Sequence, residues 1–247
     1  MQHSILGVIP ARFASSRFPG KPLAVVAGKS MLRHVWERAS RAACLSRLVI
    51  ATDDQRIFAE ACTFGAEARM TRADHSSGTD RVAEVAATEP ADLVVNIQGD
   101  EPLVDPAAIE TAVRGLIEHP EAAMSTLKRR IRDGRDLADP NVVKVVTDAR
   151  GNAIYFSRFA IPYDRGAGAV HYQHIGLYVY TREFLLRYPG LTVGPLERAE
   201  RLEQLRALEN GCCIQVVETE YESVGVDTPE DLERVSSLLE TGLTALR

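Results

Sequence analysis

Residues 8–22 read Val8-Ile9-Pro10-Ala11-Arg12-Phe13-Ala14-Ser15-Ser16-Arg17-Phe18-Pro19-Gly20-Lys21-Pro22, so an apolar strand leads directly into a loop with three cations, two hydroxyls and one glycine. In α/β sheets, the carboxyl end of the first strand opens onto the ligand crevice. Backbone N–H groups and Lys or Arg side chains at that place can surround phosphate oxygens. The stretch therefore predicts a polyphosphate-binding loop, with a nucleoside triphosphate as the ligand.

The established phosphate-binding motifs are absent from this stretch. No G-x-G-x-x-G follows the strand, and Gly28-Lys29-Ser30 lacks the glycine five residues earlier, because Leu23 stands there. The pattern thus favours neither a dinucleotide-binding fold nor a P-loop NTPase. The alternative interpretation is a solvated basic loop, but two prolines and a glycine make this loop stiffer than a surface loop needs to be.

The composition is that of an ordinary globular chain. Its 247 residues are 45% hydrophobic and 26% charged, with a formal net charge of -5. This balance argues against nucleic acid as a partner, and no segment approaches the roughly 18 apolar residues of a membrane span. We therefore expect a cytoplasmic protein without a membrane partner. Its four cysteines lack the C-x-x-C spacing of zinc or redox sites and are expected to be buried thiols: Cys44, Cys62, Cys212 and Cys213.

The first half of the chain alternates strands and helices. A helix over 31–44 capped by Ser30, a strand over 48–51, a helix capped by Asp53-Asp54 and a strand over 66–70 follow the loop. This order is typical of a doubly wound, mostly parallel sheet. A further helix at 81–88 and a strand at 93–98 complete the half, and that strand delivers Gly99-Asp100-Glu101-Pro102 into the same crevice.

The pattern changes at Met124. The β-rich runs 142–146 and 153–156 predict a hairpin, and residues 172–180 alternate as a strand with Ile175, Leu177 and Val179 on one face. Residues 196–208 predict one amphipathic helix, and a strand at 214–217 and a helix from Pro229 return to the parallel core. We therefore expect one domain over 1–247, with an antiparallel, β-rich insertion lobe at about 124–195.

Two carboxylates are candidate ligands for a divalent metal. Nucleotidyl transfer from a triphosphate needs such a metal, and Mg²⁺ is usually held by one or two carboxylates together with phosphates and water. Asp100 follows a buried strand beside a glycine, and Asp227 precedes the last helix. The alternative for the second is a helix cap, since Thr228 is a natural N-cap with Asp231 at N3. Both interpretations of Asp227 can hold together.

From its first strand to its last helix, the chain resembles the CMP-Kdo synthetases, the 3-deoxy-D-manno-octulosonate (Kdo) cytidylyltransferases. The basic loop alone indicates a wider superfamily that includes sialic-acid activators and sugar-1-phosphate uridylyltransferases, and later segments narrow the resemblance to the Kdo branch. The chain departs from the family between Pro162 and His171, where the segment is short and Tyr163 replaces a tryptophan. The matching segments are 9–12, 19–23, 51–53, 70–79, 96–102, 143–146, 155–158, 174–178, 202–206 and 225–232.

The resemblance implies the fold of nucleotide-diphospho-sugar transferases and a cytosolic, homodimeric, Mg²⁺-dependent enzyme. It would convert CTP and Kdo into CMP-Kdo and pyrophosphate for lipopolysaccharide assembly, through attack of the sugar C2 hydroxyl on the α-phosphate. Arg12, Lys21 and Asp100 would be catalytic, and Asp100 and Asp227 would hold the metal. The expected nucleotide-binding residues are Ala11, Arg12, Arg17, Lys21, Thr71, Asp74, Ser77, Gly78 and Gln98.

The sugar pocket is expected to use Gln98, Arg158, His174, Tyr178 and Glu203. The carboxylate of Kdo suits the guanidinium fork of Arg158, and its hydroxyls suit the mixed donors and acceptors of the others. The alternatives are that Tyr178 packs in the core, that Glu203 is solvated, and that residues 71–78 form a solvated turn.

Two other functions are compatible with parts of this pattern. The same chemistry could activate another acidic sugar, such as a sialic acid or an amino variant of Kdo. A catalytically silent nucleotide-sensing protein could also keep the fold, but the presence of Lys21, Asp100 and Asp227 together argues against it.

Overall fold

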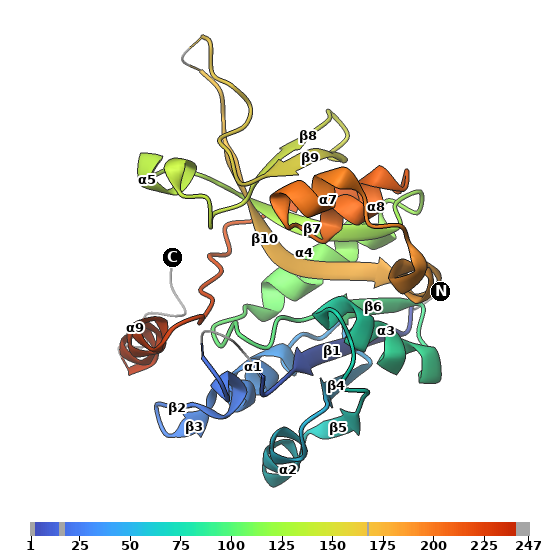
Figure 1. The fold of residues 1–247 in the computed structure, drawn as a ribbon, viewed down its shortest axis with the longest axis vertical. Helices are drawn as coiled ribbons and strands as arrows, with labels where there is room; N and C mark the ends of the chain where they lie inside the picture. The colour runs from blue at the N-terminus through green and yellow to red at the C-terminus, as the bar shows by residue number, and fades with distance from the viewer. Residues whose placement is uncertain (1–2, 15–17, 167, 241–247) are drawn as a thin grey trace. The chain divides into compact units, whose positions relative to one another are not determined.

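The computed structural model of the chain describes residues 3–14, 18–166 and 168–240 (Figure 1). The chain divides into two compact units, one made of Met1–Glu110 with Ser223–Arg247 and the other of Thr111–Glu222. The second unit includes the expected lobe at 124–195 and extends beyond it at both ends. Among the described helices, none is long and apolar enough to cross a membrane.

The first unit is built on a parallel sheet. Its strands are β1 (Ile5–Ala11), β4 (Arg47–Thr52), β5 (Glu67–Met70) and β6 (Leu93–Asn96). β1 lies between β4 and β6, and β5 pairs with the far edge of β4, all in parallel register. Val8 and Ile9 of β1 have no exposed surface, as expected for a parallel strand covered on both faces. The prediction of a mostly parallel sheet is confirmed.

The helices of the first unit begin where their capping residues predict. Ser30 caps α1 (Met31–Ala39) and Asp54 caps α2 (Gln55–Thr63), each by accepting a backbone N–H of the first turn. α1 ends five residues earlier than predicted, and α3 (Gly78–Thr88) begins three residues earlier because Ser77 and Asp80 form a capping box.

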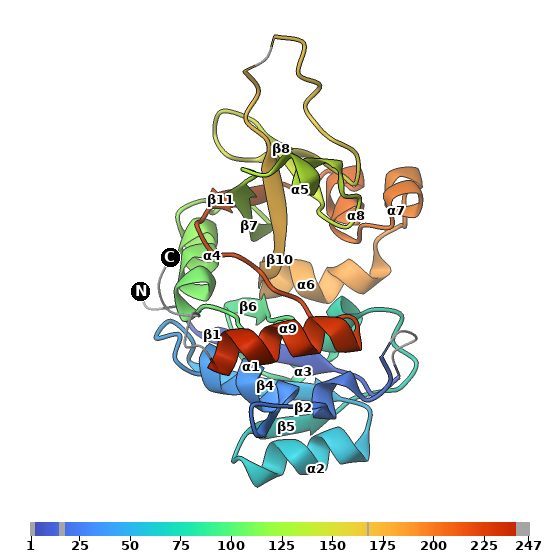
Figure 2. The same cartoon turned by 90° about the vertical axis from the view of Figure 1, so that its left-hand side faces the viewer.

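The chain returns to the first unit through its last helix. α9 (Pro229–Glu240) lies beside β2 (Val25–Val26), which pairs with β3 (Lys29–Ser30) (Figure 2). Val235 of α9 is buried in one apolar cluster with Met31 of α1 and Val26 of β2. Val226, just before the helix, belongs to the same apolar cluster. This packing fixes the segment that carries Asp227.

The second unit contains antiparallel strands, as predicted. β10 (Tyr172–Thr181) is antiparallel to β7 (Met124–Arg130), and β8 (Lys144–Thr147) forms the expected hairpin with β9 (Ala153–Ser157). β11 (Ile214–Glu218) pairs in parallel with the other edge of β7. Ile175, Leu177 and Val179 of β10 are buried, which confirms the predicted inward face. The remaining elements are α4 (Pro106–Ile117), which joins the units in sequence, α5 (Gly134–Ala138), α6 (Arg182–Arg187) and the 3₁₀ turn η2 (Tyr188–Gly190).

The prediction of a single helix over 196–208 is wrong. The segment forms α7 (Pro195–Glu200) and α8 (Gln204–Glu209), because Arg201 between them has a left-handed φ of 53°. The Glu209 carboxylate accepts the backbone N–H groups of the first turn of α7 at 2.9 Å. The apolar spacing alone could not reveal this reversal, because both short helices keep the same period.

The prediction of buried cysteines is also wrong in part. Cys62 lies on α2 and is exposed, while Cys44, Cys212 and Cys213 are half-buried, and all of them are free thiols. Cys44 lies beyond the end of α1, where burial raises the pKa of its thiol to about 11.

Candidate active site

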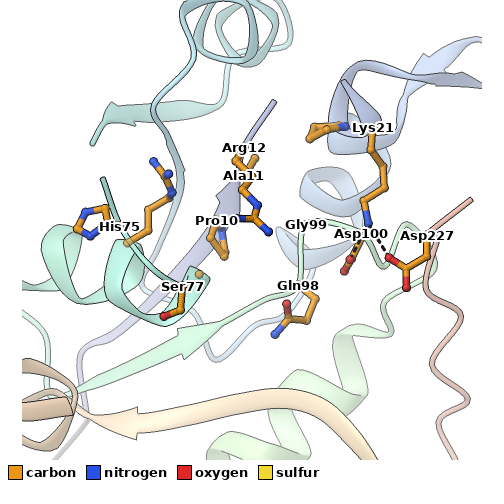
Figure 3. Close-up of a pocket in the computed structure, with 13 residues that line it drawn as sticks. Pro10, Ala11, Arg12, Lys21, His75, Ser77, Gln98, Gly99, Asp100 and Asp227 are labelled. Atoms are coloured by element: carbon orange, nitrogen blue, oxygen red, sulfur yellow. Dashed lines mark hydrogen bonds and ion pairs between the residues drawn. The ribbon is translucent and has the colours of Figure 1, made fainter. Parts of the chain in front are cut away.

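A pocket of about 300 Å³ opens at the carboxyl ends of β1 and β6 in the first unit (Figure 3). A volume of this size lies at the lower end of the range for small-molecule sites. The end of β1, the turn η1 (Lys21–Leu23), the start of α3, the loop after β6 and the segment before α9 all contribute. The lining residues are Pro10, Ala11, Arg12, Lys21, Pro22, His75, Ser77, Gly78, Arg81, Gln98, Gly99, Asp100 and Asp227.

Gly99 allows the loop after β6 to pack directly on the end of β1. A Cβ atom at this position would lie 2.6 Å from the carbonyl oxygen of Pro10, so no larger residue fits without a backbone shift. The close approach sets Gln98 and Asp100, on either side of the glycine, beside the residues that follow β1 (Figure 3).

Lys21 reaches the pocket from a closed loop. The backbone N–H of Gly20 donates to the carbonyl of Phe13 at 2.9 Å, and Gly20 takes a left-handed φ of 73° immediately before η1. These features return the chain to β1 and start η1 at Lys21, whose side chain is only 12% exposed. The loop therefore places one nearly buried ammonium group in the pocket.

The Lys21 ammonium joins two carboxylates. Its Nζ lies 2.8 Å from Asp100 Oδ2 and 3.3 Å from Asp227 Oδ1 (Figure 3). The same Nζ donates to the Val226 carbonyl at 2.6 Å. All three ammonium donors are thereby used. The two aspartates come from loops that are far apart in the sequence, and their side chains keep 37% and 47% exposure. Two partly accessible carboxylates thus converge on one cation at the pocket wall.

The donor set at this point suits a hard divalent cation. Carboxylate oxygens are the protein ligands that Mg²⁺ prefers, and it commonly takes its other ligands from phosphates and water. Within the described ranges, no group of three or more His, Cys, Asp or Glu residues could hold a metal. Asp100 and Asp227 are therefore suited to bind a cation that a triphosphate brings with it.

The helix-cap interpretation of the Asp227 segment is confirmed for its neighbours Thr228 and Asp231, and the metal-ligand interpretation of Asp227 stays a prediction. Thr228 Oγ1 accepts the backbone N–H of Asp231 at 3.3 Å, and Asp231 Oδ2 accepts the backbone N–H groups of Asp227 and Thr228 at 3.0 and 3.1 Å. Burial of Asp231 opposes its ionisation, but these bonds keep its pKa below the usual value. Since Thr228 and Asp231 form the cap, the Asp227 carboxylate is left to contact Lys21.

The segment between β5 and α3 is held from the helix side. The Arg81 side chain is 5% exposed, hydrogen-bonds Thr71 Oγ1 and pairs with Asp53 Oδ2 at 3.1 Å. The His75 ring hydrogen-bonds the carboxylate of Glu84 on α3. These contacts fix the segment that ends at Ser77 and Gly78, so this wall of the pocket is preformed.

Comparisons with known proteins agree with this geometry. A sequence model of the cytidylyltransferase family matches residues 6–221. A 3-deoxy-manno-octulosonate cytidylyltransferase of Solibacter usitatus is 64% identical over 98% of this chain and 97% of its own length. The chain belongs to the 3-deoxy-manno-octulosonate cytidylyltransferase family. A second member, from Syntrophotalea carbinolica, is 56% identical over 96% of this chain and 98% of its own length.

A solved structure of the same kind supports the assignment. It is described as CMP:2-keto-3-deoxy-manno-octonic acid synthetase complexed with CTP, is 43% identical, and superposes with a TM-score of 0.93 over 97% of this chain and 99% of its own. The resemblance inferred from the sequence is confirmed.

The pocket of this cytidylyltransferase gathers most of the residues predicted to bind nucleotide. Ala11, Arg12, Lys21, Ser77, Gly78 and Gln98 line it. Thr71 is not a lining residue and bonds Arg81 instead, and Asp74 is exposed and paired with Arg72 at 2.8 Å. Arg17 lies outside the described residues. The roles of all these residues toward a nucleotide stay predictions.

Sequence reasoning missed two polar side chains of the pocket, His75 and Arg81. His75 stands inside a segment shared with the family, which was a usable signal. Arg81 is one turn into α3, where a basic residue normally faces solvent, and its contacts with Asp53 and Thr71 explain its burial.

Of the residues predicted to bind sugar, Gln98 lines this pocket and the other four lie in the second unit. Arg158 follows β9, and its Nε donates to the Glu200 carbonyl at 2.8 Å. The Glu203 carbonyl accepts the Tyr188 hydroxyl at 2.6 Å. Their role in sugar binding stays a prediction.

His174 of β10 is buried in the second unit. Its Nε2 lies 3.0 Å from Thr126 Oγ1, and its ring contacts Phe156 edge-on and Tyr178 at centroid distances of 5.0 and 5.4 Å. Burial lowers the pKa of His174 to about 3, so its ring is neutral at physiological pH. The neutral ring has one donor and one acceptor nitrogen, of which Nε2 is engaged with Thr126, and it cannot serve as a charged group.

Proposed function

We propose that this chain transfers the cytidylyl group of CTP to Kdo, giving CMP-Kdo and pyrophosphate for lipopolysaccharide synthesis. The observation that carries the proposal is the convergence of Lys21, Asp100 and Asp227 in one pocket at the end of β1. The names of relatives up to 64% identical and the CTP complex of a 43% identical synthetase also support the proposal.

The reaction is a direct displacement at phosphorus. The C2 hydroxyl oxygen of Kdo forms a bond to the α-phosphorus of CTP, the bond to pyrophosphate breaks, and the hydroxyl proton passes to solvent. Arg12 and Lys21 line the pocket and offset the charge of the triphosphate. No covalent enzyme intermediate is required, so the pocket needs to position and neutralise the substrates but needs no nucleophile of its own.

Asp100 and Asp227 are the residues that we propose to hold Mg²⁺. They fit the ion because both offer hard oxygen ligands toward one point, which the Lys21 ammonium contacts in this structure. When bound, the metal would supply positive charge to the triphosphate. Lys21 would then exchange its carboxylate partners for phosphate oxygens. Its charge would neutralise the two aspartates in the empty site and the triphosphate in the occupied site.

For the sugar, we propose that Arg158 receives the carboxylate of Kdo. Gln98, His174, Tyr178 and Glu203 would meet its hydroxyls. A neutral His174 suits this role, since a sugar hydroxyl can either donate to or accept from an uncharged imidazole.

We also propose that the enzyme acts in the cytoplasm as a homodimer. Large apolar side chains of the second unit support a protein partner, because Ile154, Phe159, Tyr163 and Val170 are 59%, 83%, 88% and 40% exposed. Sedimentation equilibrium tests the dimer, and Phe159→Ser with Tyr163→Ser should shift it toward the monomer.

The activity is tested by pyrophosphate release from CTP and Mg²⁺ with a panel of acidic sugars. We expect turnover with Kdo and loss of turnover when the metal is chelated. If the enzyme prefers an amino-Kdo or a sialic acid, that sugar and not Kdo is its substrate. The names of the relatives do not favour this alternative. Absence of pyrophosphate release with every sugar acid would refute the enzymatic function.

A further inference from the structure

A buried lysine of the second unit has no part in the chemistry described above. Lys144 begins β8 and has no exposed surface. Its Nζ donates to the backbone carbonyls of Asp139, Val142 and Arg158 at 2.8, 2.7 and 3.0 Å. All three donors are thus used, and burial holds the pKa of Lys144 below its usual value. A buried ammonium is costly, so the contacts that it makes call for an explanation.

The Lys144 ammonium links the turn over residues 139–142 to the backbone of Arg158, because it donates to carbonyls of both. The same turn also holds the guanidinium, because Arg158 Nη1 donates to the Pro140 carbonyl at 3.0 Å. The position of this turn, and with it one contact of the guanidinium, therefore depends on Lys144.

Glu200, at the end of α7, holds Arg158 from the other side. Its Oε2 accepts the backbone N–H of Arg158 at 2.9 Å, and its carbonyl accepts Arg158 Nε at 2.8 Å. Its Oε1 in turn accepts the hydroxyl of Ser157 at 2.7 Å, and the hydroxyl of Tyr155 lies 3.4 Å away. The carboxylate and the carbonyl of one residue thus fix both the backbone and the guanidinium of Arg158.

These contacts leave a defined part of the Arg158 guanidinium for a ligand. Nε is used by Glu200 and one Nη1 proton by Pro140, whereas Nη2 makes no hydrogen bond to any residue that the structure describes. One Nη1 proton and both Nη2 protons therefore remain for a ligand, and two parallel N–H groups of a guanidinium can bind a carboxylate with two bonds.

We propose that Lys144 and Glu200 are positioning residues that aim the tip of the Arg158 guanidinium at the carboxylate of the acidic sugar. The inference rests on the proposed function, which assigns that carboxylate to Arg158. Preorganisation of this kind lowers the cost of fixing a long, flexible side chain when the ligand binds.

The test is a double-mutant cycle on the full-length enzyme, read by pyrophosphate release. Lys144→Met keeps the aliphatic stem and removes the ammonium, and we expect it to raise KM for Kdo about tenfold, with kcat and KM for CTP within twofold. In an Arg158→Ala background, the same change should move KM for Kdo less than twofold. An equal effect in both backgrounds, or a parallel rise in KM for CTP, would show a general structural role and overturn the proposal.

Two further variants keep the test decisive. Lys128→Met is the matched control, because this lysine lies in the same unit but contacts Thr147 and the Tyr172 ring, and it should leave both KM values unchanged. If Lys144→Met does not fold, Ser157→Ala removes the hydroxyl that donates to Glu200 and accepts the Phe159 backbone N–H at 3.0 Å, and it should raise KM for Kdo about threefold. An unchanged KM in Ser157→Ala would then overturn the proposal.

The outcome with Arg158→Ala alone separates the two levels of inference. If that variant leaves KM for Kdo unchanged, the assignment of Arg158 to the sugar fails, and the positioning role fails with it. If it raises KM for Kdo while Lys144→Met does not, only the positioning role is refuted.

Discussion

Replacement of Lys21 by alanine tests the centre of the proposed site. The ammonium is 12% exposed and bridges Asp100 and Asp227 at 2.8 and 3.3 Å. In the reaction, Lys21 would exchange the two aspartates for phosphate oxygens. The alanine variant therefore loses only the difference in free energy between the phosphate contacts and the aspartate contacts. One desolvated, charge-assisted hydrogen bond is worth about 2 kcal/mol, which corresponds to a decrease of roughly 30-fold in kcat/KM for CTP.

The same replacement should change metal binding in the opposite direction. Without an internal cation, the two carboxylates repel each other and attract Mg²⁺ more strongly, so calorimetry without CTP should record tighter binding of Mg²⁺ to Lys21→Ala than to the wild type. The kinetic assay is pyrophosphate release over a range of CTP concentrations at saturating Mg²⁺ and Kdo.

Lys29→Ala is the matched control, because this lysine lies nearby in the first unit but pairs with Glu37 at 2.5 Å and does not line the pocket. It should leave both measurements unchanged. A well-folded Lys21→Ala enzyme with an unaltered kcat/KM for CTP would refute the reasoning, since Lys21 would then be a structural counter-ion for the two aspartates and nothing more.

Four other changes have defined outcomes. Asp100→Asn keeps the shape of the side chain but removes its charge, so kcat should fall on the order of 100-fold with the melting temperature retained, and near wild-type turnover would remove Asp100 from the site. Arg158→Lys loses the planar fork, so KM for Kdo should rise about tenfold while KM for CTP stays within twofold; the reverse pattern in steady-state kinetics would place Arg158 in the nucleotide site. In Gly99→Ala the new Cβ would approach a β1 carbonyl to 2.6 Å, and urea unfolding should record a loss of about 1–3 kcal/mol, whereas Gly134→Ala has no neighbour within 4 Å and should differ little from the wild type. The buried ring of His174 has its pKa lowered to about 3. Because the unfolded state takes up this proton near pH 6.5, the residue should cost about 2 kcal/mol of stability between pH 7 and 5, and a His174→Gln variant with the same pH dependence would contradict this.

Local structure was largely predictable from the sequence, because its causes act over a few residues. Ser30, Asp54 and Thr228 cap helices by bonds to backbone groups within three positions, and these bonds can be read from residue type and spacing. The strands followed from apolar runs in the same way. The prediction failed over 196–208, where a left-handed Arg201 reverses the chain and no spacing of apolar residues signals it.

The sequence by itself determined the kind of chemistry that this protein performs. A basic loop after the first strand, a carboxylate after the β6 strand and another before the last helix are enough to predict a triphosphate and a hard cation, because residue types limit the ligands that they can bind. Only the tertiary structure decided which of these charges meet. Lys21 contacts partners 79 and 206 positions away, and the burial of Arg81 and Lys144 depends on acceptors from other elements. Such contacts arise from the path of the whole chain, which no local pattern encodes, and they set the electrostatics of the site.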